Sequence, residues 1–529
     1  MPPRHKKPVR RKRGKNRKLP VRGRRPANRG GAAMKVRVRM YRQGLGDCFL
    51  VTFDPSGNEK HMMIDCGTLG ASTTGVKLAQ VAADIRTTTG DHLDLLIGTH
   101  EHWDHVSGFD SLKDEFAKIQ VDNVWLAWTE NPEDELAKQL AKDQRDLGSA
   151  LRLTSRALAA AGNGASQSIG DAVRDLLGFF NAEDPLGAAS KFKESLDAAM
   201  QFVRKRPGAK VEYFKPGKLI EPDWLPGFRF YVLGPPYSES ALNDLGEHGS
   251  SELYHITAGL RAAAAQSLSG LSATDHAAAI GDHTAQDAFE RELPFDARFR
   301  FQKDDSRIQD AFQKTYFADA AAWRRVDADW LHLSADLALQ LDNATNNTSL
   351  VLAIERITDG KVLLFPADAQ EGSWVSWHDA AIQWNIPGNP DPVNAKSLLA
   401  NTVFYKVGHH SSHNATAKGK GLELMKKEQE LTAFIPVDRK VALGRHPQGS
   451  WKMPARPLYR RLLEKCRGRV VRSDIGWATP PDQATLPETE EAFEGMATAA
   501  EWATWQAEQQ AKDGTQVVIS KLHIDYILA

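Results

Sequence analysis

The sequence predicts an α+β protein in which a β-rich core is interrupted by large helical insertions. Short strand-like runs follow Met34 and return beyond about residue 340, whereas the stretches at about 130–207 and 237–340 are mostly helical. A third observation is the segment 98–108, GTHEHWDHVSG, which places three histidines and two acids directly after the apolar run LDLLI. We therefore expect an enzyme-like core whose strand ends carry functional side chains.

The strands are predicted from short apolar or alternating runs bounded by turn residues. These runs lie at 35–42, 48–54, 61–65, 92–99, 121–128, 210–220, 228–236, 346–355, 360–368, 401–410, 432–438, 469–474 and 515–528. A helix is expected at 75–90, between the third and fourth runs, because its apolar residues recur at helical spacing. The order strand, helix, strand is typical of α/β and α+β enzymes.

The two insertions are predicted from helical spacing. Leucines recur on one face of the first insertion, and a second apolar face follows the Ala/Gly/Ser-rich loop AAAGNGASQS. The first face holds Leu136, Leu140, Leu147 and Leu151, and the second holds Phe192, Leu196, Met200 and Val203. Residues 484–513 predict one further surface helix. Because the insertions emerge between ligand-bearing segments, we expect them to form a lid or a surface for a protein partner.

Residues 1–34 form a basic tail with 14 Lys and Arg residues and no acid. Taking those 14 from the 68 basic residues leaves 54 against 67 acidic residues, so the remaining body carries a net charge of −13. Such a tail cannot bury enough apolar surface to fold alone. It is either an arm that binds nucleic acid by counterion release or a stretch upstream of the true start at Met34.

Targeting features are lacking in this sequence. The tail has no apolar signal-peptide core, and no segment offers about 18 uninterrupted apolar residues, so we expect a cytoplasmic protein without a membrane partner. Cys48, Cys66 and Cys466 are too few and too irregularly spaced for a disulfide framework, and we expect reduced core residues.

The histidine-rich loop predicts a site for two metal ions. His100 and His102 project to one side of an extended segment and suit one ion, while Asp104 and His105 can reach a second. Two further metal ligands are expected at later strand ends: Asp368, which can bridge the ions, and His409, which stands beside His410. Imidazole and carboxylate ligands favour Zn²⁺ or Mn²⁺ as the cofactors.

At these residues the sequence resembles a known family. THEHWDH is similar to the H-x-H-x-D-H signature of metallo-β-lactamase-fold hydrolases, and GLGDCFLV, MMIDCG, NNTSLVL, LLFPAD, KVGHHSS, GRHP and VVRSDIG resemble motifs of the hydrolase domain of ComEC-type competence proteins, in the same order. The matches cover somewhat more than half of the chain and leave the helical insertions out. The resemblance implies an αββα metallo-β-lactamase sandwich with a binuclear metal site at one edge, and phosphodiester cleavage.

Two departures from the wider superfamily bear on the site. Around Asn346 to Ser349 related enzymes carry a third histidine for the first metal, which the ComEC-like group also lacks. The first ion is left with His100, His102, Asp368 and a neutral oxygen from Asn346, Asn347 or Ser349, which makes Mn²⁺ a plausible working metal. The second departure is Ala367, which stands where the family usually has Gly.

Several residues are expected to assist the metal ligands. Asp65 is assigned to orienting the metal loop, although a simple turn aspartate is an equal alternative, and Asp47 has the same ambiguity. We assign catalysis to Asp104, His410 and His446; His446 would protonate a leaving group or grip a phosphate, or is an ordinary loop histidine before Pro.

Three functional hypotheses remain open from the sequence. The first is a metal-dependent nuclease or phosphodiesterase acting on nucleic acid or a nucleotide. The second is a hydrolase of small esters, lactones or β-lactams, because the same water activation serves those bonds. The third is a regulatory protein on a hydrolase scaffold, whose helical insertions bind a protein partner.

Overall fold

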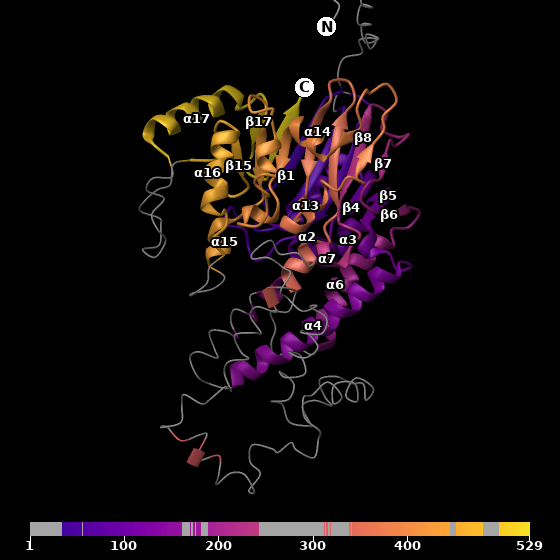
Figure 1. The fold of residues 1–529 in the computed structure, drawn as a ribbon, viewed down its shortest axis with the longest axis vertical. Helices are drawn as coiled ribbons and strands as arrows, with labels where there is room; N and C mark the ends of the chain where they lie inside the picture. Colours follow the sequence, from indigo (N-terminus) through magenta and orange to yellow (C-terminus); the bar gives the residue numbers. More distant parts are fainter. Residues whose placement is uncertain are drawn as a thin grey trace, which may run out of the picture. The chain divides into compact units, whose positions relative to one another are not determined.

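The computed structural model describes most of the chain beyond the basic tail. The described residues are 34–54, 57–160, 170, 173–174, 176–180, 189–242, 312, 314–315, 318, 338–339, 341–444, 451–479 and 497–529. The predicted basic tail and most of the predicted insertion at 237–340 lie outside these residues. Figure 1 shows the two large sheets of the described part and the helices around them.

The first sheet contains eight strands in the order β17-β18-β1-β2-β3-β4-β5-β6. These strands are β1 Val36–Tyr41, β2 Cys48–Phe53, β3 Lys60–Cys66, β4 His92–Gly98, β5 Gln120–Ala127, β6 Lys210–Phe214, β17 Val517–Ile519 and β18 His523–Leu528. Neighbours from β3 to β6 are parallel, and the others are antiparallel. The run at 515–528, which predicts one strand, folds as the hairpin β17–β18, because the polar residues Ser520 and Lys521 form its turn.

The second sheet also contains eight strands, in the order β16-β15-β14-β13-β10-β9-β8-β7. These strands are β7 Leu219–Ile220, β8 Phe228–Gly234, β9 Val351–Arg356, β10 Lys361–Phe365, β13 Thr402–Lys406, β14 Thr432–Ile435, β15 Val470–Arg472 and β16 Gly476–Trp477. A small separate sheet pairs β11 Gln383–Trp384 with β12 Val393–Asn394. The strands β10, β13, β14 and β15 are parallel, so both large sheets contain a block of parallel strands.

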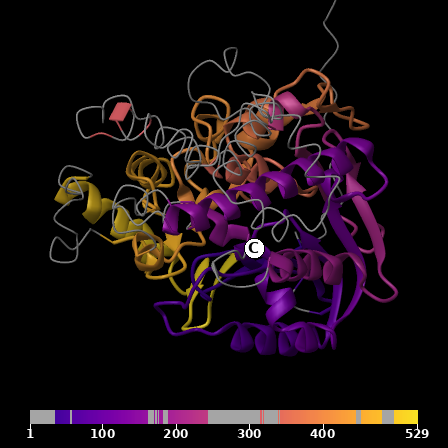
Figure 2. The ribbon, with the colours of Figure 1, turned by 90° about the horizontal axis from the view of Figure 1, so that it is seen from below.

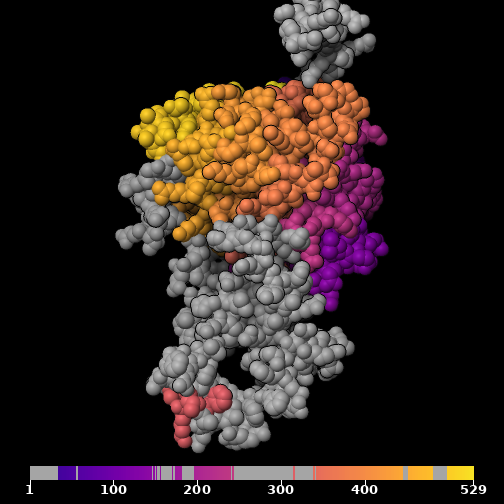
Figure 3. Space-filling view, in the orientation of Figure 1, coloured from indigo at the N-terminus to yellow at the C-terminus, as the bar shows by residue number. Residues whose placement is uncertain are grey.

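The two sheets pack face to face around a buried apolar layer. Aromatic rings from opposite sheets meet in it: Phe49 with Phe365, Trp125 with Phe230, and Phe404 with Tyr526, at centroid distances of 6.0, 5.1 and 5.0 Å. Burying such rings is the largest apolar contribution to a sandwich core. The orange surface in Figure 3, which belongs to residues 341–444, makes most of the face of the sandwich in that view.

Helices cover the outer faces of the sandwich. The described helices are α1 Leu78–Thr89, α2 Trp103–Ser111, α3 Lys113–Phe116, α4 Glu135–Ala160, α6 Ala189–Arg204, α7 Glu239–Leu242, α13 Glu371–Ser376, α14 Ala395–Ala400, α15 Arg439–Leu443, α16 Arg456–Lys465 and α17 Ala499–Lys512, with short 3₁₀ turns η1 Trp128–Glu130, η2 Gly178–Phe180, η6 His409–Ser411 and η7 Leu422–Leu424. Helix α1 contacts β4 of the first sheet, and α14 contacts β10 of the second. The predicted α+β sandwich with helical outer layers is confirmed.

The predicted surface helix at 484–513 is α17 over its described part. One face of α17 is buried, because Trp502, Trp505 and Gln509 point inward. Gly468 permits this packing: a Cβ there would lie 2.3 Å from Cβ of Trp505. Among the described helices, none combines the length and the apolar character needed to cross a membrane.

Helices α4, η2 and α6 lie within the predicted first insertion. Leu147, Leu151, Met200 and Val203 are buried in the apolar cluster that reaches the first sheet. In Figure 1 α4 and α6 lie at the end of the sandwich where α2 begins, and the view from below shows the purple helix α4 crossing over this end (Figure 2). This part of the chain therefore stands next to the loops that follow the parallel strands.

A buried ion pair joins the chain's last strand to its first. Arg39 lies opposite Asp525 in the register of β1 and β18, and its Nε and Nη2 donate to the two carboxylate oxygens at 2.8 and 2.9 Å. Arg39 Nη1 also donates to Asp84 of α1 at 2.7 Å. Burial alone would raise the pKa of Asp525, but hydrogen bonds from His523 and Arg39 lower it to about 2.

We predict that Asp525→Asn lowers the free energy of unfolding at pH 7 by about 2 kcal/mol. The folded pKa lies below the unfolded value of about 3.9, so the stabilisation is present above pH 4 and is lost as the pH falls toward 2. Urea unfolding of both proteins at pH 7 and at pH 3 measures this. The exposed Asp223→Asn is the matched control, with an expected change within about 0.5 kcal/mol. An equal difference at both pH values would contradict the linkage.

Candidate metal centre

The candidate centre lies where the parallel strands of both sheets end. Asp65 closes β3, the loop His100–His105 follows β4, Asp368 follows β10, and His410 follows β13. Carboxyl ends of parallel strands meet at one edge, which is where open sheets bind ligands. The facing sheets therefore bring together side chains more than 300 residues apart, such as Asp104 and His410.

Two glycines hold the histidine loop against the first hairpin. A Cβ on Gly46 would lie 2.5 Å from the carbonyl oxygen of Asp104, and a Cβ on Gly67 would lie 2.2 Å from the Asp104 carbonyl carbon. Without side chains, the turn lets Asp47 N–H donate to Asp104 O at 3.0 Å. The GLGD and IDCG motifs thus fix the backbone of the metal loop.

Asp65 orients two residues of that loop. Its carboxylate accepts from the Thr99 N–H at 2.8 Å and the Thr99 hydroxyl at 2.6 Å, and it lies 2.8 Å from His105 Nδ1. The Nδ1–H of His105 therefore faces Asp65, which turns Nε2 toward the centre.

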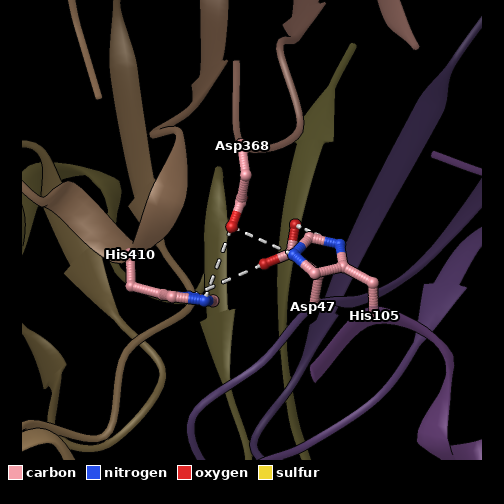
Figure 4. Close-up of side chains that lie close together, drawn as sticks. All are labelled: Asp47, His105, Asp368 and His410. Atoms are coloured by element: carbon pink, nitrogen blue, oxygen red, sulfur yellow. Dashed lines mark ion pairs between the residues drawn. The ribbon is translucent and has the colours of Figure 1, made fainter. Parts of the chain in front are cut away.

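One group of donors gathers around His105 and His410 (Figure 4). His105 Nε2 lies 3.1 Å from Asp368 Oδ2, and His410 Nε2 lies 2.7 Å from Asp104 Oδ2 and 3.8 Å from Asp368 Oδ2. His410 Nδ1 donates to the Pro436 carbonyl at 2.7 Å, so its Nε2 also points inward. Asp47, His105, Asp368 and His410 offer ligand atoms that all lie within 4.8 Å of one another.

A second group is formed by His100 and His102. His100 Nδ1 lies 3.1 Å from the Thr99 hydroxyl and 3.3 Å from that of Ser349, which leaves its Nε2 facing His102 Nδ1 at 3.1 Å. The Ser349 hydroxyl also accepts from the Asp368 N–H at 3.2 Å. Ser349 thus contacts both a histidine of this group and the backbone of Asp368.

Lys406 is a buried cation beside these carboxylates. Its Nζ lies 2.5 Å from Asp47 Oδ2 and 3.0 Å from Asp368 Oδ1, and it also donates to the Ala367 carbonyl at 2.7 Å. Asp368 Oδ1 further accepts from the His409 N–H at 2.9 Å, so only Oδ2 remains to face the histidines. Sequence reasoning missed Lys406, although a lysine inside the apolar strand TVFYK was a usable signal.

Burial and neighbouring charges displace the pKa values of the centre. Burial and the adjacent imidazoles lower the pKa of His100 well below its ordinary value. For His105, burial acts in the same direction, but the carboxylates of Asp368 and Asp47 raise its pKa well above that value. Burial would raise the pKa of Asp368, yet Lys406 and the histidines hold it well below its usual range. The carboxylates therefore draw positive charge into the centre.

The donor set fits divalent metal ions. Several buried polar atoms at the centre have no hydrogen-bond partner in the described part of the chain: Asp47 Oδ1, His102 Nε2, Asp104 Oδ1, His105 Nε2, Asp342 Oδ1, Asn346 Oδ1 and Asp368 Oδ2. His105 Nε2 and Asp368 Oδ2 face each other at 3.1 Å, and a divalent cation would take the place of the proton that this pair holds when no metal is bound. Imidazole nitrogens and carboxylate oxygens are ligands that Zn²⁺ and Mn²⁺ accept.

Asp342 was missed by the sequence analysis. It is fully buried, and its Oδ1 lies 3.7 Å from His102 Nε2, while Asn346 Nδ2 donates to Oδ2 at 3.1 Å. Burial, together with Asp104 and Asp368, raises the pKa of Asp342 well above its ordinary value. A carboxylate facing the outer nitrogen of a ligand histidine fixes the ring tautomer and strengthens the ligand. Asp342 lies far from the histidine loop in the sequence, so no motif spacing connects the two.

The remaining sequence-predicted residues have other contacts. His409 Nδ1 lies 3.1 Å from the Ser412 hydroxyl and 3.3 Å from Gln370 Nε2, and burial lowers its pKa to about 4. Asn347 Oδ1 accepts from the Gln370 N–H at 3.1 Å, and its amide group donates to the Leu242 carbonyl at 3.0 Å. His446, assigned to catalysis from the sequence, lies outside the described residues.

The first insertion contacts the centre directly. The ring of Phe179 lies 5.5 Å from that of His102, and the ring of Phe180 lies 4.9 Å from it. Arg204 of α6 donates to Glu101 at 3.0 Å and also to Glu130. Burial and the nearby Glu130 raise the pKa of Glu101 to about 8, although Arg204 opposes the shift. The insertion thus shields the histidine loop and fixes its position.

Comparison with known proteins identifies a family for part of this chain. Residues 41–155 match the model of the metallo-beta-lactamase superfamily, a range that includes the whole histidine loop. No curated protein matches the chain. The chain therefore carries a metallo-β-lactamase superfamily domain, and this match together with the donor cluster supports a metal-dependent hydrolase.

We predict that Lys406→Met lowers the free energy of unfolding of the metal-free protein by about 3 kcal/mol, because it leaves Asp47 and Asp368 buried without their cation. Added Mn²⁺ should then raise the melting temperature more in the variant than in the wild type. Thermal unfolding in chelator and in Mn²⁺ measures both effects, with the exposed Lys396→Met as control. A variant as stable as the control in chelator would contradict this account.

A second prediction concerns Asp342. Asp342→Asn should weaken metal binding at the His100–His102 group by roughly 10- to 100-fold, since the amide keeps an acceptor oxygen but loses the charge. Chelator competition followed by mass-spectrometric metal analysis checks this, beside the exposed Asp391→Asn. Unchanged metal affinity in Asp342→Asn would show that its carboxylate does not support His102.

Proposed function

We propose that this chain, which carries a metallo-β-lactamase superfamily domain, is a phosphodiesterase or nuclease that uses two divalent metal ions, Zn²⁺ or Mn²⁺. The observation that carries the proposal is the presence of two adjacent donor groups with inward-facing lone pairs. His100 and His102 form one group, and Asp104, His105 and His410 form the other. Asp368 is the carboxylate suited to serve both.

Two ions bound in these groups would supply an activated water and stabilise the negative charge that develops on a phosphodiester. The protein contributes the geometry. Asp65, Pro436 and Asp342 keep the ligand nitrogens aimed inward, and Lys406 holds Asp368 in one orientation. Phe179 and Phe180 cover His102 and exclude bulk water from that side of the centre.

The phosphodiester substrate is supported by two further features. The motif resemblance to ComEC-type hydrolase domains implies this bond. Two-metal sites also suit phosphodiesters because the attacking and leaving oxygens can each lie near an ion. With only two histidines in the first group and no third one at Asn346 to Ser349, Mn²⁺ is the metal we favour.

The test is hydrolysis of bis(4-nitrophenyl) phosphate and of single- and double-stranded DNA and RNA, with added Mn²⁺ or Zn²⁺. We expect cleavage that chelation abolishes and that His410→Ala and Asp104→Ala each reduce by more than about 100-fold. His378→Ala removes a half-buried histidine that is not part of the donor cluster and should leave the rate unchanged.

The alternatives give different results. Intact phosphodiesters together with hydrolysis of a lactam, a lactone or a carboxylic ester would replace the proposal with the small-ester hypothesis. A protein that hydrolyses none of these substrates but retains a co-purifying protein would favour the partner-gated hypothesis.

A further inference from the structure

A cavity next to the metal centre has no role in the chemistry described so far. Its volume is about 690 Å³, and His409 and Asp342 form the wall nearest the centre. The other walls come from η2 of the first insertion and from the segment that leads into α16. A cavity of this size holds a small organic ligand.

The cavity has an aromatic wall. The ring of Phe179 stacks on that of Trp451 with a centroid distance of 4.6 Å and an interplanar angle of 22°. Phe179 also lies 5.5 Å from His102 and 6.4 Å from His409, measured between ring centroids. The stacked pair therefore forms an aromatic part of the cavity wall beside His102.

Cations outnumber acids around this cavity. Arg439, Lys452 and Arg456 line it, against Asp342 as the acidic residue among its described walls. This concentration contrasts with the acidic body of the chain, which carries 54 basic against 67 acidic residues once the tail is set aside. A basic cavity in an acidic protein attracts anions locally.

We propose that this cavity is a substrate subsite for a nucleoside phosphate group, which places one nucleotide of the substrate beside the metal centre. The planar base would pack on the Phe179–Trp451 wall, and a phosphate would pair with the cations of the rim. This inference rests on the proposed phosphodiesterase function and specifies its substrate class. The cavity volume suits about one or two nucleotides, so the substrate is either a small nucleotide or the end of a strand.

The first experiment measures binding in chelator, so that catalysis is not required. Calorimetry compares adenosine 5′-monophosphate, ribose 5-phosphate and inorganic phosphate on the full chain. We expect the nucleotide to bind roughly 5- to 150-fold more tightly than ribose 5-phosphate, which is the contribution of stacking one base. Trp451→Ala should abolish this preference, and Trp451→Phe should retain most of it.

The contribution of the cations that line the cavity is tested separately, at Lys452. Lys452→Ala should weaken binding of all three phosphates by a similar factor and reduce the salt dependence, whereas the exposed Lys396→Ala should change neither. Circular dichroism confirms that each variant is folded. Equal affinity for the nucleotide and ribose 5-phosphate, or a preference that survives in Trp451→Ala, would overturn the proposal.

Hydrolysis in Mn²⁺ separates this proposal from the proposed function. A Trp451-dependent preference for the nucleotide without hydrolysis of any phosphodiester would support the subsite and refute the phosphodiesterase. Phosphodiester hydrolysis with no preference for base-bearing substrates would support the phosphodiesterase and refute the subsite. Comparing a dinucleotide with a long single strand and a blunt duplex then distinguishes a free nucleotide from a strand end.

Discussion

The burial of carboxylates at one edge of the sandwich is the constraint on which the rest of the centre depends. Asp47, Asp65, Asp104, Asp342 and Asp368 are all buried there, and each would cost several kcal/mol without compensation. Lys406 neutralises part of this charge, and ligand histidines face the rest. The same buried negative charge attracts divalent ions, and binding them offsets the cost of burial. Metal binding and local stability are therefore linked at this edge.

The fold and the histidine loop could be predicted because both depend on patterns within short stretches of sequence. Strand periodicity gives the sheets, and the spacing of His100, His102, Asp104 and His105 gives the ligand types. The sequence analysis expects His409 as the ligand, whereas the donor cluster of the structure contains His410. Both residues have positive φ, 40° and 50°, so the alternation of an extended strand no longer applies. The structure directs His410 to Asp104, and this follows from the turn rather than from the order of residues.

Ala367 shows how one backbone position limits the site. The resemblance leads one to expect glycine there, and Ala367 has φ of 50°, a left-handed conformation that costs an alanine roughly 1 kcal/mol. The position is held because its carbonyl accepts from Lys406 and the next residue is Asp368. The backbone strain is therefore located at Ala367, the residue that positions the carboxylate of Asp368, as is common at functional sites.

Asp342 could not be predicted because its partners are set by tertiary structure alone, whereas Lys406 was marked by its place in an apolar strand. Asp342 follows the second predicted insertion, and Arg204 comes from the first, yet they contact His102 and Glu101 of one loop. The first insertion is therefore part of the metal centre as well as its cover. Deleting the first insertion would remove the contact of Arg204 with Glu101, so this deletion cannot separate loss of a partner from loss of metal. Substitutions at exposed positions of α4, such as Lys138, leave that support intact and are the sound test of a docking role.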